Sequence, residues 1–246
     1  MSEPTIEDLC ELGQEQLMET RYLEAEATLV RAAGMARAAG DWDRLSRLYM
    51  PLQETRRQRR QRCGEGIVRL DLLAEGPDDV IDPRHVLEHD PHGQLLVAGW
   101  GTLEPARAIR AMAAERALYV ETFLAAVYPV NGSRVVVIAP FEDAAIPALG
   151  IQSVDELTTR LPDGCLVLPE SELPHGSMKG TPQTYGRVMA MWERLHAPFL
   201  AGADAEQDLL RKVEFYGRTI AVDYACELAH QKLAAAAREL TRRAGV

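Results

Sequence analysis

The spacing of apolar residues in the first quarter of the chain predicts helices. Four apolar residues recur at helical intervals near the start: Ile6, Leu9, Leu12 and Leu17. Thr5, ahead of two acidic residues, is a suitable helix start, so the pattern predicts a helix over 5–19. Further helices are predicted over 22–40 and 41–62. Pro51 lies inside the third pattern and removes a backbone donor, so we expect a kink there.

After residue 66 the pattern changes to short apolar runs, which predict strands. The predicted strands are 67–73, 94–100, 118–128, 133–140 and 165–168. Asn131-Gly132 is a dipeptide that supplies the positive φ of a type I′ turn, so the third and fourth strands should form a hairpin. An amphipathic helix over 103–117 joins two strands as a crossover, and a short helix is expected over 154–161. These elements predict a small mixed sheet.

Two long helices are predicted to close the chain, over 182–200 and 205–243, with Gly202-Ala203-Asp204 as the break between them. One face of the second helix carries a stripe of large side chains: Tyr216, Ile220, Tyr224, Leu228 and Leu233. Such a stripe must be covered. The simplest arrangement packs it on the N-terminal helices, and the alternative packs it on the sheet.

The patterns together predict a mixed α/β protein in three segments: helices over 1–63, a mixed α/β domain over 64–175 and a C-terminal helical hairpin over 176–246. A chain of 246 residues can bury a core sufficient for stability without disulfides. Its cysteines are widely spaced, with no C-x-x-C pair, which indicates free thiols in a reducing compartment. They are Cys10, Cys63, Cys165 and Cys226.

Charge and hydropathy narrow the classes of partner. The formal charge of −10 repels phosphate backbones, so we expect neither nucleic-acid nor anionic-membrane binding. The N-terminus is acidic where a secretory signal would be basic, and no window approaches the ~20 apolar residues that cross a bilayer. We therefore expect a cytoplasmic protein.

The first predicted hairpin resembles the tetratricopeptide repeat over residues 9–42. The resemblance rests on the Leu12-Gly13 pair and on small residues at Ala25 and Ala32. Other usual positions differ: Leu9 replaces a Trp, Gln16 a Tyr, Leu29 a Phe and Arg37 a Pro. The match covers one and a half repeats, whereas about three are normally needed to bury a continuous core. The resemblance implies a helical surface for protein binding, and it requires another segment to cover the hairpin.

His85, Glu88 and His89 have the residue order of the inverted zinc-protease motif, in which two histidines bind zinc and the glutamate activates water. Asp82-Pro83 and Asp90-Pro91 bracket this segment and leave less than two helical turns. An exposed polar turn is therefore the preferred interpretation, and the three residues are kept as the candidate metal site of a hydrolase.

Two Glu-x-x-His pairs, Glu193/His196 and Glu227/His230, have the spacing used by di-iron carboxylate sites in helix bundles. In a simple hairpin folded at Gly202 the two pairs would be about 24 Å apart, at ~1.5 Å per residue. They could not share a metal. Each pair is interpreted as a local polar contact on a solvated helix face.

Gly99 and Gly101 lie at the end of a predicted strand, and Thr102 caps the helix that follows. At such a junction, backbone N–H donors can hold a phosphate. Glu104 stands at the third glycine position and would repel a pyrophosphate, so a tight packing turn is preferred. The irregular segment 169–181 contains usable acid and base groups, but their spacing assigns no roles. It and the turn would form the wall of any active site.

Five arginines lie between residues 56 and 62. Arginine-rich helices can bind RNA, but cations near a helix C-terminus also complement its dipole and find acidic partners in an acidic protein. We favour the structural interpretation. The leading functional hypothesis is a non-catalytic interaction or scaffold module with no cofactor, whose partner is a protein, a second copy of the chain included. The alternatives are a small-molecule or nucleotide enzyme at the Gly99–Thr102 turn and 169–181, and a metal-dependent hydrolase at His85, Glu88 and His89.

Overall fold

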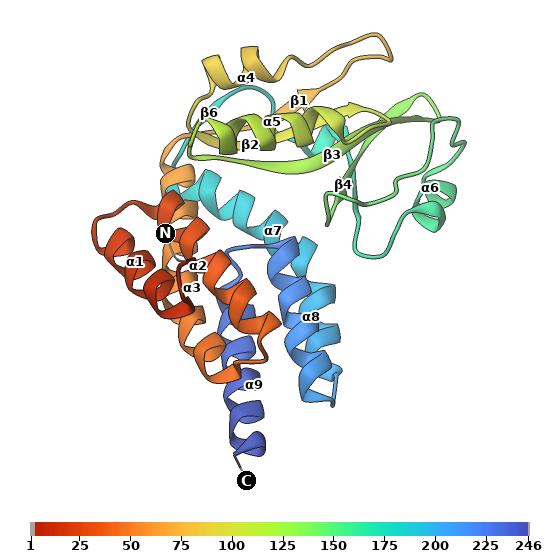
Figure 1. Ribbon diagram of the computed structural model, residues 1–246. Coiled ribbons are helices and arrows are strands. Elements are labelled where there is room, and N and C mark those ends of the chain that lie inside the picture. Colours follow the sequence, from red (N-terminus) through yellow and green to blue (C-terminus); the bar gives the residue numbers. More distant parts are fainter. Residues whose placement is uncertain (1–2, 246) are drawn as a thin grey trace. The chain divides into compact units, whose positions relative to one another are not determined.

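The computed structural model describes residues 3–245, which divide into two compact units of a mixed α/β protein (Figure 1). A helical unit contains the residues up to Arg60 and those from His196 onward, and a sheet unit contains residues 61–195. The predicted α/β class is therefore confirmed. Both ends of the chain belong to one unit in the structure. The sequence prediction instead divided the chain into three consecutive segments.

The helical unit is built from the two ends of the chain. Its helices are α1 (Ile6–Met18), α2 (Tyr22–Ala38), α3 (Trp42–Glu65), α7 (Pro182–Ala205), α8 (Leu209–Val222) and α9 (Glu227–Ala244), of which α3 and α7 extend into the sheet unit. Thr5 begins α1 with a capping box, because its hydroxyl accepts from Asp8 N–H while the Asp8 carboxylate accepts from Thr5 N–H.

One apolar core joins the helices from both ends of the chain. Leu29 and Leu45, from α2 and α3, and Leu233 of α9 are all fully buried in it. Small residues let the helices approach, as at Ala32 and Ala229. This core covers the apolar faces of both terminal segments.

Two glycines of the first hairpin have opposite surroundings and give matched predictions. A Cβ at Gly13 would lie 2.7 Å from Leu29 Cδ2, whereas a Cβ at Gly34 would meet no atom within 4 Å. We expect Gly13→Ala to lower the free energy of unfolding by about 1–3 kcal/mol through overpacking. Gly34→Ala should raise it by about 0.5–1 kcal/mol through helix propensity. Urea unfolding measures both, and shifts of the same sign would contradict the packing described here.

The sheet unit contains six strands in the order β5-β4-β3-β2-β1-β6. They are β1 (Ile67–Leu73), β2 (Gly93–Trp100), β3 (Val120–Val130), β4 (Ser133–Ala139), β5 (Leu166–Pro169) and β6 (Met178–Lys179). The first three are parallel, and the other pairings are antiparallel. The predicted hairpin is confirmed, with positive φ at Asn131 (49°) and Gly132 (76°) between β3 and β4.

Helices cover both faces of this sheet. The side chains of Leu95, Val97 and Leu124 pack in a core with α4 (Pro83–His89), α5 (Glu104–Glu115) and α6 (Val154–Arg160). Phe123 points to the opposite face because side chains alternate along a strand, and its ring stacks on Trp192 of α7 at 4.2 Å. A single 3₁₀ turn, η1 (Glu170–Glu172), follows β5.

The C-terminal helix boundaries differ from the sequence prediction. α7 continues through Gly202 to Ala205, so the predicted break at Gly202 is wrong. The predicted helix over 205–243 is also wrong, because it is divided into α8 and α9 by a turn at residues 223–226. The Asp223 carboxylate accepts from Ala225 N–H at 3.2 Å within this turn, which competes with the helical hydrogen bonds. None of the helices in residues 3–245 combines the length and apolar content needed to cross a membrane.

Candidate functional site

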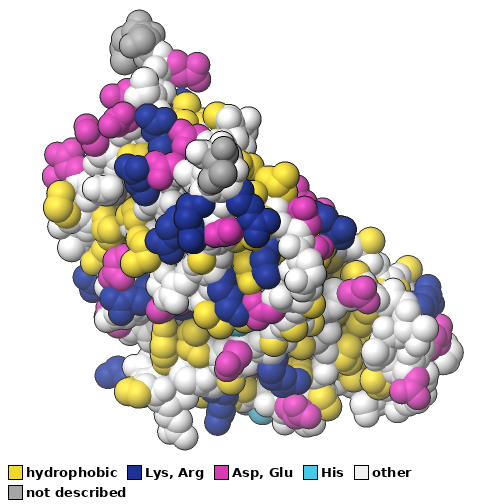
Figure 2. All heavy atoms as spheres, turned by 90° about the horizontal axis from the view of Figure 1, so that it is seen from below, with side chains coloured by type: hydrophobic (Ala, Val, Ile, Leu, Met, Phe, Trp, Pro, Cys, Tyr) yellow, Lys and Arg dark blue, Asp and Glu magenta, His cyan; other side chains and the backbone are white. Residues whose placement is uncertain are grey.

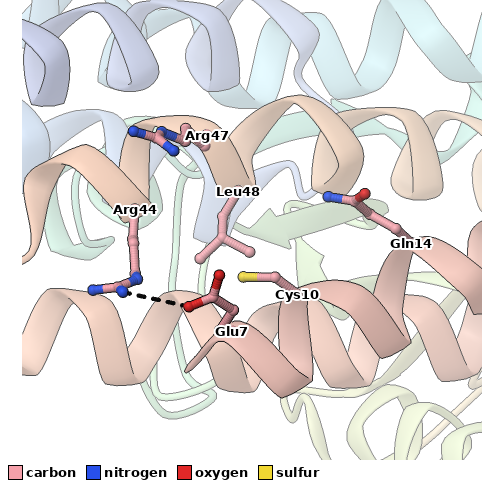
Figure 3. A pocket seen from close by; sticks show the side chains of 6 residues that line it. All are labelled: Glu7, Cys10, Gln14, Arg44, Arg47 and Leu48. Atoms are coloured by element: carbon pink, nitrogen blue, oxygen red, sulfur yellow. Dashed lines mark ion pairs between the residues drawn. The ribbon is translucent and has the colours of Figure 1, made fainter. Parts of the chain in front are cut away.

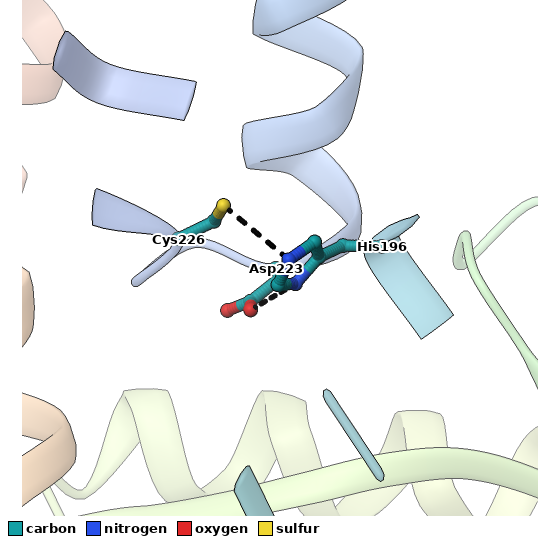
Figure 4. Close-up of side chains that lie close together, drawn as sticks. All are labelled: His196, Asp223 and Cys226. Carbon is teal, nitrogen blue, oxygen red and sulfur yellow. Dashed lines mark hydrogen bonds and ion pairs between the residues drawn. The ribbon is translucent and has the colours of Figure 1, made fainter. Parts of the chain in front are cut away.

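The turn between α8 and α9 places Asp223 and Cys226 beside His196 of α7, as Figure 4 shows. His196 Nδ1 lies 2.7 Å from Asp223 Oδ2, and its Nε2 lies 3.6 Å from Cys226 Sγ. Within residues 3–245, these three form the one group of His, Cys and acidic side chains close enough to share a metal ion. The Asp223 side chain is 1% exposed and that of His196 is 13% exposed. The cluster is therefore largely closed to water.

Arg60 of α3 completes this cluster and determines its charge. Its Nη1 lies 2.7 Å from Asp223 Oδ1, and both side chains are buried. Burial opposes ionisation of Asp223, but Arg60 and His196 hold the pKa of its carboxyl below the usual value. Burial also opposes protonation of His196, but hydrogen bonds to Asp223 and Cys226 raise its pKa to about 10. His196 is consequently an imidazolium at neutral pH.

This charge distribution limits the chemistry of the cluster. An imidazolium has no lone pair for a metal ion, so His196 must lose a proton before it can be a metal ligand. The Arg60 guanidinium also occupies one carboxylate oxygen of Asp223. The arrangement of thiol, imidazole and carboxylate resembles a catalytic triad in order, but Arg60 and His196 both bind the Asp223 carboxylate, which favours a buried ion network that holds the α8–α9 turn.

A second buried network lies around Glu26 of α2. Arg56 Nε donates to Glu26 at 2.9 Å, and Arg59 Nη1 donates to the other carboxylate oxygen at 2.6 Å. Arg56 Nη1 lies 3.2 Å from His230 Nε2, while His230 Nδ1 lies 2.9 Å from the Cys226 carbonyl oxygen. Burial and Arg56 lower the pKa of His230 to about 4. His230 is therefore neutral, donating from Nδ1 and accepting at Nε2.

A pocket of about 270 Å³ opens next to this network, between α2, α3 and α8. Arg37, Tyr49 and Arg56 supply its polar atoms, and Leu52 and Ile220 are among its apolar residues. Arg37 Nη2 donates to Tyr49 Oη at 3.1 Å. The lining contains no acidic residue.

A second pocket, of about 150 Å³, lies between α1 and α3 (Figure 3). α1 contributes Glu7, Cys10 and Gln14, and α3 contributes Arg44, Arg47 and Leu48. The two arginines are paired: Arg44 lies 2.6 Å from Asp41 and 3.7 Å from Glu7, and Arg47 lies 2.5 Å from Asp43. We call this the α1/α3 pocket.

The candidate hydrolase residues remain separate from these sites. His85, Glu88 and His89 are exposed on the short helix α4. His89 Nδ1 lies 2.9 Å from the His85 carbonyl oxygen, and the two imidazole rings lie 4.2 Å apart. The three side chains do not form one of the close ligand groups found among the described residues.

The Gly99–Thr102 turn is explained by packing. A Cβ at Gly99 would lie 2.8 Å from Pro105 and Thr102 atoms, and Gly101 has φ +63° with Leu149 against it. Thr102 Oγ1 accepts from Glu104 N–H at 3.2 Å, although the helix cap itself is Leu103. Each glycine is thus required by a close approach or by its backbone conformation.

The segment 169–181 passes from β5 at one edge of the sheet to β6 at the other. Its polar groups help to hold it in place. Glu170 forms an ion pair with Arg134, and Gly176 N–H donates to Asp71 at 2.6 Å. His175 is exposed. These contacts assign the segment a structural role, and they give no acid, base and nucleophile in mutual contact.

The Glu-x-x-His pairs correct one sequence interpretation. Glu193 and Glu227 are exposed as expected, but His196 is largely buried and His230 fully buried, so the histidines do not lie on a solvated face. Sequence reasoning did not select Asp223, Cys226 or Arg60 as one cluster. Only the arginine run gave a signal, because a buried arginine requires an acidic partner.

All five arginines of that run have intramolecular acidic partners. Arg56 and Arg59 bind Glu26, Arg57 binds Glu54, Arg60 binds Asp223 and Arg62 binds Glu65. On the face drawn in Figure 2, basic and acidic side chains are intermixed. This pairing is what the structural interpretation of the arginine run expects, and it offers no uniform basic surface for RNA.

Comparisons with known proteins give no relative for this chain: no family model, curated protein or solved structure matches it. The function must therefore be inferred from the sites themselves.

Proposed function

We propose that the protein is an interaction module whose helical unit binds a peptide segment of a partner protein in the α1/α3 pocket. The observation that carries the proposal is this pocket of about 150 Å³ between the first and third helices, a volume suited to one large apolar side chain. Cys10 and Leu48 provide apolar surface for that side chain. The helical-hairpin resemblance to a tetratricopeptide repeat supports the same role.

The charges around the pocket favour an apolar anchor over an acidic one. Arg44 and Arg47 already have carboxylate partners, so an acidic anchor would have to compete with Asp41 and Asp43. Gln14 is exposed on the pocket rim and its amide can pair with a peptide backbone. The preferred ligand is thus a short peptide with one large aliphatic or aromatic residue.

Exposed methionine extends this surface. Met18 lies one helical turn after Gln14, on the same face of α1, and is 79% exposed. A methionine side chain adapts to differently shaped partners, which suits a peptide-binding surface. Met18 therefore adds one exposed apolar side chain beyond the pocket.

A random peptide library screened against the purified chain tests the proposal. Selected peptides should share an apolar anchor and should slow maleimide alkylation of Cys10 more than that of Cys165, which is also partly buried but belongs to the sheet unit. Cys10→Phe fills the pocket and should weaken peptide binding at least about tenfold, the size expected for a central anchor site.

Gln14→Trp is the second blocking variant, because it changes an exposed residue and leaves the core intact. Cys165→Ser is the matched control and should bind like the wild type. Circular dichroism confirms that each variant folds. Selection of no peptide, or binding by both blocking variants as tight as that of the wild type, would overturn the proposal.

A further inference from the structure

The pocket between α2, α3 and α8 is a separate site with different chemistry. It is larger than the α1/α3 pocket, about 270 Å³ against about 150 Å³, and shares no lining residue with it. Gly34 borders it and has no atom within 4 Å of its Cβ position. The missing side chain therefore leaves the pocket open.

Arg37 is an exposed cation in the lining of this pocket. Its guanidinium donates to Tyr49 Oη, and within residues 3–245 it has no carboxylate within ion-pair distance. It lies over Gly217, where a Cβ would be 3.1 Å from Arg37 Nη2. Glycine at this position lets the guanidinium rest against α8, at the wall of the pocket. A cation held this way, in a pocket without acidic residues, favours an anion.

Two further donors point to the same chemistry. Arg56 uses Nε for Glu26 and Nη1 for His230, which leaves its Nη2 without a hydrogen-bond partner among the described residues. Tyr49 Oη accepts from Arg37 and keeps its own O–H for donation. Planar guanidinium groups bind carboxylate and phosphate oxygens in pairs. Leu52, which lies between Tyr49 and Arg56 on the same face of α3, and Ile220 of α8 supply apolar contact.

We propose that this pocket binds a compact organic anion, with its phosphate or carboxylate held by Arg37, Arg56 and Tyr49 and its apolar part against Leu52 and Ile220. The volume suits a ligand near the lower end of the ligand-pocket range of about 300–1,000 Å³. The site is independent of the peptide surface proposed above.

Isothermal titration at constant ionic strength tests the site with defined probes. Phenyl phosphate and benzoate distinguish the two anionic groups, inorganic phosphate tests the need for an apolar part, and phenol is the neutral control. We expect saturable binding of phenyl phosphate or benzoate, weaker binding of inorganic phosphate and none of phenol. Absence of saturable binding of both aromatic anions would overturn the proposal.

Three variants locate the binding. Arg37→Gln should weaken the anion at least about tenfold, Tyr49→Phe should weaken it less, and Gly34→Leu should block it without any change of charge. Arg31→Gln is the matched control, because Arg31 lies on the same helix, is exposed and is paired with Glu3. If Arg31→Gln and Arg37→Gln lose the same amount of anion affinity, the anion is attracted by the overall charge of the protein and not by a specific site. Unchanged binding by Gly34→Leu would also contradict the proposal.

Discussion

Asp223→Asn should lower the free energy of unfolding of the helical unit by about 3–5 kcal/mol, the cost of leaving one member of a buried ion pair uncompensated. The substitution keeps the shape of the side chain and its hydrogen-bonding oxygen but removes the charge. Arg60, 2% exposed, then loses its carboxylate, and the protonated His196 loses the other half of the same interaction. Urea unfolding followed by circular dichroism measures the loss.

A matched exposed pair provides the control. Glu239 on α9 contacts Arg242 and Arg243 at the surface, so Glu239→Gln should change stability by less than about 1 kcal/mol. Hydrogen exchange of the α9 amides assigns the loss to the helical unit. In a double-mutant cycle, Arg60→Met should recover part of the loss caused by Asp223→Asn, since it removes the buried guanidinium and leaves only His196 without its partner. A loss as small as that of Glu239→Gln would contradict the buried ion network.

Acidification should destabilise the helical unit through His230. Its pKa is about 4 in the folded protein, against 6.5 in an unfolded chain. The unfolded state therefore binds more protons between these values, and stability that is present above pH 6.5 is lost progressively as the pH falls to 4. The full loss is about 3 kcal/mol, at about 1.4 kcal/mol per pKa unit. His230 is fully buried, so solvent does not screen the effect.

Unfolding by urea at several pH values measures this dependence, with His230→Gln removing the titration. The surrounding groups have separate windows. The folded pKa values of Glu26 and Asp223 are lowered, so the stability that these carboxylates contribute is lost only near or below pH 4.5. The folded pKa of His196 is raised, so the stability that it contributes stays constant below pH 6.5. His175→Gln, at an exposed position, is the control. An identical loss from pH 6.5 to 5 in wild type and His230→Gln would contradict the assignment.

Local patterns predicted the elements of this fold with few errors. The strand over 67–73, the hairpin at Asn131-Gly132 and the helices of the first hairpin were all correct in type and position, because each depends on neighbours within a few residues. The errors came at Gly202, which α7 includes, and at residues 205–243, where the apolar stripe continues in phase across the break. Asp223 forms the turn because Arg60 and His196, distant in sequence, bind its carboxylate.

The candidate sites also combine features that the sequence determines with features that only the tertiary structure determines. The sequence alone determined the mixed α/β class and the apolar faces that must be covered, since periodicity reports which side of an element is buried. Only the tertiary structure could bring His196 to Cys226, place Arg37 over Gly217 and leave Gly34 facing an open pocket. Such sites combine side chains separated by up to about two hundred positions, and no local pattern encodes which distant residues will meet.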